Sequence, residues 1–121
     1  MMAENPAISP QALAAQIKAH PFGDADIALA VLEDPDVAEV YSASTSTFPA
    51  KHWLETYRVS FGQMAKKAKV HGGDAVLQEL EKLSANDPIS LFAYDANGQL
   101  GLFWLTEDNR LVGFAIVVPK K

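Results

Sequence analysis

The stretch that decides the fold is ISLFAYDANGQLGLFWLTEDNRLVGFAIVV, residues 89–118. It contains three runs that are rich in aliphatic, aromatic and β-branched residues, the types that strands favour. The turn sequences DANG and EDN separate these runs, and both are strong signals for a chain reversal. The sequence therefore predicts an antiparallel meander of three strands, at 89–95, 99–106 and 110–118.

The apolar residues of this meander fall on both faces of the predicted sheet. In the middle strand, Phe103 and Leu105 share one face and Trp104 lies on the other, because successive side chains alternate. The same alternation in the last strand sets one apolar group against another, namely Val112, Phe114, Ile116 and Val118 against Leu111, Ala115 and Val117. An antiparallel sheet with one wet face would carry polar residues at every second position. We therefore expect both faces to be covered, either by helices on both sides or by another chain on one side.

The residues before the meander predict four helices and one short strand. Serine and aspartate suit helix starts, and a proline after the last turn ends a helix. Residues 36–43 allow a strand or a helical turn, and the strand is preferred. The predicted order is a helix from Ser9-Pro10 to His20-Pro21, a helix from Asp24 to Asp34-Pro35, the strand 36–43, a helix at 49–69, and a helix capped by Asp74 that closes at Asn86-Asp87-Pro88.

The predicted helix 49–69 is the longest element, and its apolar residues recur at spacings of three and four. Trp53, Tyr57 and Phe61 form an aromatic stripe along it, which we expect to pack on the sheet. Helices at the N-terminal side and strands at the C-terminal side indicate an α+β fold. We expect residues 1–121 to form a single domain, with 1–8 as a flexible N-terminal tail.

The composition excludes several classes of function. The chain has 121 residues, of which 49% are hydrophobic, and it has no cysteine, which excludes disulfides, thiol nucleophiles and cysteine-based metal sites. A formal net charge of −5 disfavours nucleic-acid binding, which needs a basic surface. The N-terminus carries no visible signal peptide, and no apolar run approaches the ~20 residues that span a bilayer. We therefore predict a cytoplasmic protein with neither a nucleic acid nor a membrane as its partner.

The charges are unevenly distributed along the chain. Residues 1–40 hold seven acids and one base, whereas residues 51–69 hold five bases and one acid. The two segments either partly face each other or are simply solvated, or they form a polarised surface for a charged partner. The partner hypothesis assigns another protein, with a basic one as the natural complement, to the carboxylates of Asp24, Asp26, Glu33, Asp34, Asp36 and Glu39.

A run of hydroxyl residues, YSASTSTFPAKHW at 41–53, stands directly before the long helix. Such residues either cap the helix or, together with its free N–H groups, hold an anion. A phosphate-binding loop usually also contains glycines, and none lies between Gly23 and Gly62. Capping is therefore the preferred interpretation, and the alternative is a pocket with Tyr41, Ser44, Thr47 and His52 at its mouth.

No sequence motif points to a reaction, a cofactor or a metal. The three histidines, His20, His52 and His71, lack the spacing of a helical metal pair, and no nucleotide-binding or hydrolase motif is present. The leading hypothesis is a small non-enzymatic protein-binding module, such as a regulator, an inhibitor or an immunity-type protein. It would act through its acidic surface or a sheet face, with homodimerisation through the meander as a variant. The alternative is a small-molecule-binding domain or small enzyme whose pocket lies between the long helix and the sheet.

Overall fold

The computed structural model describes residues 9–19, 25–33, 46–64, 66–96 and 99–119. Within these ranges the chain has an α+β fold of four helices and five strands. The helices are α1 (Pro10–Ala19), α2 (Ala25–Glu33), α3 (Ala50–Met64) and α4 (Gly73–Glu81). The strands are β1 (Ser46–Pro49), β2 (Ala68–His71), β3 (Pro88–Ala96), β4 (Gln99–Thr106) and β5 (Leu111–Pro119).

The strands form one antiparallel sheet in the order β1-β3-β4-β5-β2. The predicted meander is confirmed as β3, β4 and β5, which form the centre of this sheet. The sheet is larger than the predicted three-stranded meander, because β1 and β2 add an edge strand on each side. Both edge strands have only four residues, which is too short for a strong periodic signal.

The predicted helix 49–69 was wrong at its C-terminal end. Helix α3 ends at Met64, and Ala68–His71 instead pairs with the end of β5. Ala68 continues the helical spacing of the apolar stripe, so that the pattern alone did not reveal the change to a strand. A strand at 46–49 was missed for a similar reason, since its hydroxyl residues resembled a helix entry. The strand predicted at 36–43 and the tail predicted at 1–8 lie outside the described residues.

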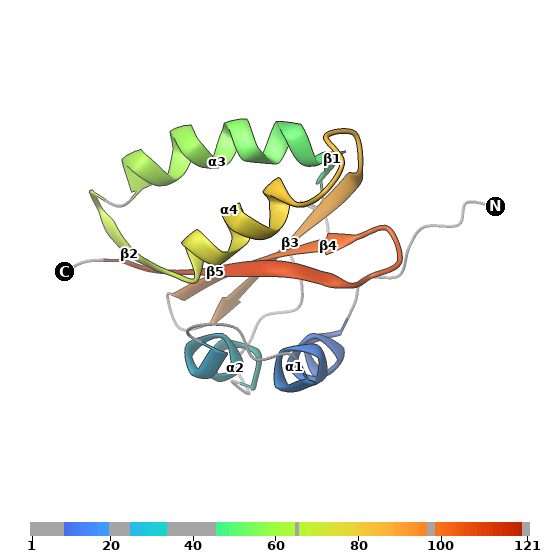
Figure 1. Cartoon of the computed structure of the whole chain (residues 1–121). Coiled ribbons are helices and arrows are strands. Elements are labelled where there is room, and N and C mark those ends of the chain that lie inside the picture. The colour runs from blue at the N-terminus through green and yellow to red at the C-terminus, as the bar shows by residue number, and fades with distance from the viewer. Residues whose placement is uncertain (1–8, 20–24, 34–45, 65, 97–98, 120–121) are drawn as a thin grey trace.

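Helices cover both faces of the sheet and make a three-layer arrangement (Figure 1). Helices α1 and α2 lie against one face, and α3 and α4 lie against the other. The protein's own helices therefore account for the apolar residues on both faces of the meander. A second chain on a sheet face is not needed to explain that pattern.

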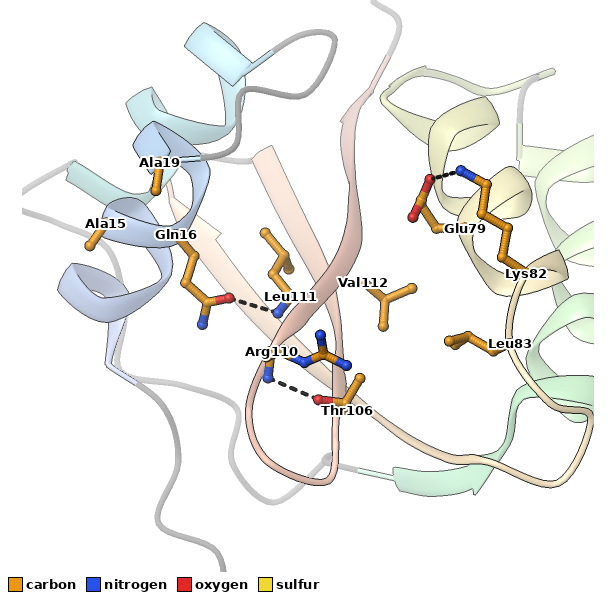
Figure 2. Close-up of a pocket in the computed structure, with 10 residues that line it drawn as sticks. All are labelled: Ala15, Gln16, Ala19, Glu79, Lys82, Leu83, Thr106, Arg110, Leu111 and Val112. Carbon is orange, nitrogen blue, oxygen red and sulfur yellow. Dashed lines mark hydrogen bonds and ion pairs between the residues drawn. The ribbon is translucent and has the colours of Figure 1, made fainter.

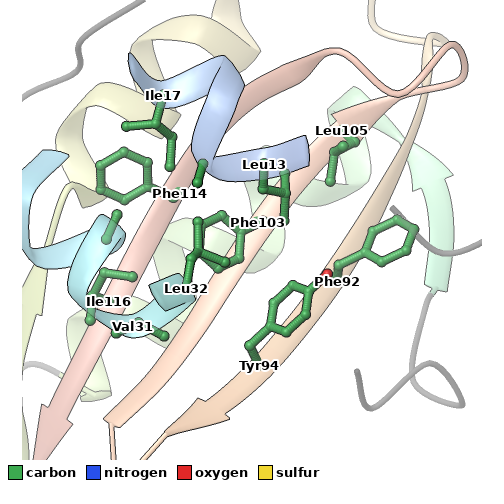
Figure 3. Packing of buried hydrophobic residues seen from close by; sticks show 12 residues of the cluster. Leu13, Ile17, Val31, Leu32, Phe92, Tyr94, Phe103, Leu105, Phe114 and Ile116 are labelled. Carbon is green, nitrogen blue, oxygen red and sulfur yellow. The ribbon is translucent and has the colours of Figure 1, made fainter. Parts of the chain in front are cut away.

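The face under α1 and α2 is packed with aromatic and aliphatic side chains (Figure 3). Phe103 lies at its centre, with its ring centroid 5.6 Å from that of Tyr94 and 6.2 Å from that of Phe114. Leu13 and Ile17 of α1 reach this cluster from the helix and are fully buried. Each such side chain contributes about 1.5–3 kcal/mol when it leaves water. This packing fixes α1 on β5, and α1 forms one wall of the groove described below.

The opposite face centres on Trp104, which α3 covers with two aromatic residues. The ring centroids of Trp53 and Tyr57 lie 6.2 and 6.1 Å from that of Trp104. The indole N–H of Trp53 also donates a 2.8 Å hydrogen bond to the carbonyl of Ile89 in β3. The prediction that the long helix packs on the sheet is confirmed for Trp53 and Tyr57, which are both buried. The side chain of Phe61 is not among those described.

A β-bulge interrupts the pairing of β4 with β5. Trp104 pairs with Gly113 and Leu105 pairs with Leu111, so that Val112 is an extra residue. The bulge places Leu111 against the α1–α2 cluster and Val112 against the α3–α4 cluster. The predicted faces of Leu111 and Val112 were therefore wrong, because the alternation of side chains shifts by one position at the bulge.

The junction of β2 and α4 depends on a glycine. Gly72 is the N-cap of α4 and has a φ of 86°, in the left-handed region that glycine adopts without strain. A Cβ atom at this position would lie 2.7 Å from the carbonyl oxygen of Phe114. The prediction that Asp74 caps this helix was wrong, because Asp74 lies inside it.

Candidate functional site

Only two of the six predicted acidic partner-binding residues lie in the described ranges. Asp26 and Glu33 are both exposed on α2. The carboxylate of Glu33 forms a 3.2 Å ion pair with Lys18 of α1, which partly neutralises it. The other four, Asp24, Asp34, Asp36 and Glu39, lie outside the described residues.

Thr47 and His52, two of the four predicted pocket residues, make contacts with different neighbours. The hydroxyl of Thr47 lies 2.8 Å from that of Ser90 in β3. The ring of His52 stacks on Phe48 at a centroid distance of 4.2 Å, and both side chains are exposed. Tyr41 and Ser44 lie outside the described residues. Between α3 and the sheet, where this pocket was expected, the side chains of Trp53, Tyr57 and Trp104 fill the interior.

The start of α3 is capped by backbone carbonyl groups from another part of the chain. The amide of Ala50 donates to the carbonyl of Asp87 at 2.8 Å, and the amide of Lys51 donates to that of Ala85 at 3.0 Å. Two of the free N–H groups that an anion would use are therefore already satisfied. Of the hydroxyl run, Ser46 and Thr47 lie in the described ranges, and both belong to the edge strand β1.

Described residues line a groove between α1 and α4, where the β4–β5 hairpin passes between them (Figure 2). Its volume is about 650 Å³. Helix α1 contributes two alanines and a glutamine to one wall, and the end of α4 with the two residues after it contributes charged and apolar side chains to the other. The groove is lined by Ala15, Gln16, Ala19, Glu79, Lys82, Leu83, Thr106, Arg110, Leu111 and Val112.

The floor of this groove is the part of β5 that has no neighbouring strand among the described residues. Strand β2 pairs with β5 only from Ile116 to Pro119, which leaves the beginning of β5 uncovered on that side. Gln16 of α1 fills this position with its side-chain amide. Its Oε1 accepts a 2.8 Å hydrogen bond from the amide of Leu111, and its Nε2 donates a 2.7 Å hydrogen bond to the carbonyl of Asn109. Gln16 thus satisfies the backbone groups that a neighbouring strand would otherwise satisfy.

The next part of the β5 edge is closed by the β2–α4 junction. Gly113 is buried and packs against Val76 of α4, while Gly72 lies against the carbonyl of Phe114. A partner strand therefore has little free backbone to pair with on β5. The groove offers side chains and a short floor rather than a long strand edge.

The β4–β5 turn fixes the position of Arg110 at the groove. The amide of Thr106 donates to the carbonyl of Arg110 at 2.9 Å, and the amide of Arg110 donates to the hydroxyl of Thr106 at 3.0 Å. Asn109 adopts a φ of 61°, which asparagine tolerates better than most residues. These contacts hold the backbone of Arg110, while its side chain remains exposed.

The cations of the groove have weak or local partners. Arg110 Nε lies 3.6 Å from Asp108 Oδ2, and the two side chains are 75% and 72% exposed, so this pair contributes little stability. The hydroxyl of Thr106 donates a hydrogen bond to Asp108, and it is the main reason why the pKa of Asp108 is lowered from its ordinary value. Lys82 pairs with Glu79, three residues earlier on α4, at 2.9 Å.

A second, smaller hollow of about 190 Å³ shares Leu83, Thr106 and Arg110 with the groove. Asp87, Glu107 and Asp108 contribute carboxylates to it, whereas Arg110 is its single cation among the lining residues. The two hollows therefore differ in charge: the groove has two cations and one carboxylate, and the smaller hollow has three carboxylates and one cation.

The lining of the groove was not predicted from the sequence. Gln16 comes from an N-terminal helix, Lys82 from the C-cap of a central helix and Arg110 from a C-terminal turn, and only the fold brings them together. The sequence partly indicated Arg110, because this residue follows the EDN turn and is the single basic residue between Lys82 and Lys120. Gln16 had none, because a glutamine on an amphipathic helix is an ordinary surface residue.

Within the described ranges, no cluster of three or more His, Asp or Glu side chains is arranged to hold a metal ion. In the same ranges, none of the helices combines the length and the apolar character that are needed to cross a membrane. The sequence matches no family model, and comparison with curated proteins and with solved structures finds no significant similarity to any of them.

Proposed function

We propose that this protein is a small non-enzymatic protein-binding module that receives an exposed segment of its partner in the groove between α1 and α4. The observation that carries the proposal is the composition of the groove. Its floor and walls contain apolar side chains, including Leu83 and Leu111, and its rim carries the exposed charges of Lys82 and Arg110. An apolar centre with a polar rim is the usual anatomy of a protein interface.

Two other surfaces have less support. The sheet faces are occupied by the helices of the protein itself, so that a partner has no access to them. On the acidic surface of α2, Glu33 is engaged by Lys18, and Asp26 is the other carboxylate described there. The groove is therefore the best supported surface within the described part of the chain.

A small-molecule ligand in the same groove is the second candidate function. A volume of about 650 Å³ lies within the range of ligand pockets, which is roughly 300–1,000 Å³. However, the amide of Gln16 is already used at both ends by the β5 backbone. Few polar groups are then left to orient a small molecule, whereas a protein segment needs fewer directed contacts and more area.

Site-specific photo-crosslinking in native cells tests the proposal. A photoreactive residue is placed at Ala19, on the groove wall, or at Ala30, which is exposed on α2 and serves as the matched control. We expect a discrete crosslinked protein from position 19 and not from position 30. Equal or absent protein crosslinking at the two positions, together with a metabolite that raises the melting temperature, would favour the small-molecule function instead.

A further inference from the structure

We infer that the partner segment is basic, and that one of its lysine or arginine side chains enters the smaller hollow and binds the carboxylates of Asp87 and Glu107 there. This inference rests on the proposed function, because it describes the chemistry of the segment that the groove receives. The hollow and the groove share Leu83, Thr106 and Arg110 (Figure 2), so that a segment in the groove passes within reach of the hollow.

The groove and the smaller hollow together carry more negative than positive charge. Their lining has four carboxylates against two cations, namely Glu79, Asp87, Glu107 and Asp108 against Lys82 and Arg110. Lys82 is paired with Glu79 at 2.9 Å. Arg110 lies 3.6 Å from Asp108. Both cations are thus matched within the lining, so that a basic side chain supplies the missing charge, whereas an acidic one would have to displace an existing pair.

The two carboxylates that are left over, Asp87 and Glu107, both line the smaller hollow. Oδ2 of Asp87 accepts a 3.2 Å hydrogen bond from the amide of Ser84, which holds this side chain in the turn before β3. Glu107 is exposed in the β4–β5 turn. Neither carboxylate forms an ion pair with another residue in the described ranges. A cation that enters the hollow therefore gains charge-assisted hydrogen bonds without breaking an ion pair.

The smaller hollow also offers apolar surface to the stem of a long basic side chain. Leu83, Pro88 and Ile89 line it together with the carboxylates. Lysine and arginine lay their methylene stems along such surface while the charged head stays close to water. The volume of about 190 Å³ is below the roughly 300–1,000 Å³ of ligand pockets, so that the hollow suits a single side chain rather than a whole ligand.

The charge of the whole protein acts in the same direction as the charge of the two hollows. The chain carries a formal net charge of −5. Long-range attraction raises the rate at which a basic segment associates, and salt screens it, with a Debye length of about 8 Å at physiological ionic strength. We therefore expect binding of the segment to weaken as the salt concentration is raised.

Selection of random linear peptides displayed on phage tests the inference without knowledge of the partner. Peptides are selected on the wild-type protein and rescreened on Ala19→Trp, which fills the groove, and on Ala30→Trp, the control on α2. We expect peptides that contain lysine or arginine, that bind the wild type and Ala30→Trp, and that fail to bind Ala19→Trp.

A double-mutant cycle then tests the contact in the smaller hollow. We expect Glu107→Gln, which removes the charge and keeps the shape, to weaken a selected peptide about fivefold, and the addition of Asp87→Asn to bring the loss to about tenfold. The same peptide with its lysine or arginine replaced by methionine should be insensitive to Glu107→Gln, because the two changes remove the same interaction. Glu55→Gln, which removes an exposed carboxylate of α3 outside both hollows, is the matched control and should have no effect.

Replacement of Arg110 distinguishes a basic segment from an acidic one. Arg110→Ala removes a cation that repels the incoming side chain and leaves Asp108 without its ionic partner. Binding of a basic peptide should therefore tighten by a small factor, about twofold, since these charges are exposed. An acidic peptide would instead bind Arg110→Ala more weakly than the wild type.

The possible outcomes separate the inference from the proposed function. Peptides that need an open groove but are acidic or neutral, or that ignore Glu107→Gln, would overturn the basic segment and leave the proposed function standing. Failure to select any peptide that Ala19→Trp blocks would overturn both. Thermal melting of each variant shows that the loss of binding does not come from unfolding, and Ala15→Trp, on the same wall, replaces Ala19→Trp if the latter unfolds.

Discussion

The side-chain amide of Gln16 in α1 hydrogen-bonds the backbone amide of Leu111 in β5 at 2.8 Å, where a neighbouring strand would otherwise bind. Helix α1, which lies on one face of the sheet, thereby covers the beginning of β5, where β2 does not pair with it. The same contact sets the floor of the groove, because it holds α1 beside the β4–β5 turn. Sheet edges that are left open invite pairing with other chains, and this one is closed by a side chain.

Replacement of Gln16 tests this closure. We expect Gln16→Ala to lower the free energy of unfolding by about 1–2 kcal/mol, because the amide of Leu111 and the carbonyl of Asn109 lose their partner. Gln11→Ala, at an exposed position of the same helix, is the control and should stay within about 0.5 kcal/mol. Urea denaturation measures both, and equal effects of the two substitutions would show that the amide contact has no particular role.

Gly72 is the position where we expect the addition of a single methyl group to lower the free energy of unfolding most. In Gly72→Ala the new Cβ would lie 2.7 Å from the carbonyl oxygen of Phe114, in a backbone conformation with a φ of 86°. We expect a loss of about 3 kcal/mol, since steric conflict adds to the backbone strain. Chemical denaturation measures the loss, and a change below about 0.5 kcal/mol would contradict the described geometry of the β2–α4 junction.

The indole of Trp53 links α3 to β3 through both packing and a hydrogen bond. In Trp53→Phe the carbonyl of Ile89 loses its 2.8 Å donor and the core loses volume next to Trp104. We expect a loss of about 2–4 kcal/mol from the two effects together. His52→Phe, a neighbouring change at an exposed position, should be nearly neutral in the same thermal and urea melts.

The buried phenol of Tyr94 should make the free energy of unfolding depend on pH at high pH. Its side chain is fully buried, and burial raises its pKa from 10.0 to about 12. Above pH 10 the unfolded chain loses the phenol proton before the folded protein does, so that unfolding becomes more favourable as the pH rises. The stability from this group is complete below pH 10 and is lost as the pH approaches about 12, at up to 1.4 kcal/mol per pH unit.

The comparison with Tyr94→Phe isolates this effect from the lysines, which titrate in the same range. The difference in unfolding free energy between the wild type and Tyr94→Phe should change between pH 9 and pH 11.5, with the wild type losing more. Parallel pH profiles for the two proteins would mean that the phenol of Tyr94 titrates normally.

The sequence predicted the parts of the fold that have long, regular patterns. The strands of the meander, the two N-terminal helices and the packing of Trp53 and Tyr57 on the sheet follow from residue spacing and turn residues. The four-residue edge strands did not, because a short segment such as Ala68–His71 fits a helical spacing as well as a strand. The faces of Leu111 and Val112 depended on a bulge that only the pairing with β4 reveals.

The candidate groove could not be predicted for a different reason. Its chemistry comes from three ordinary surface residues, Gln16, Lys82 and Arg110, that are distant in the sequence and have no motif in common. The predicted pocket at Thr47 and His52 followed local composition, which does not show which elements meet in space. In this protein the turn that places Arg110 and the two helices beside it were each predicted, whereas their meeting in space to form a groove was not.

Amide hydrogen exchange of the protein, alone and in complex with the partner captured by the photo-crosslink at Ala19, tests the central claim most directly. Binding in the groove predicts that protection increases over 106–112 and on the facing turns of α1 and α4, while α3 and β1 stay unchanged. Protection that increases instead on α3 and β1, with 106–112 unaffected, would contradict the groove as the binding surface.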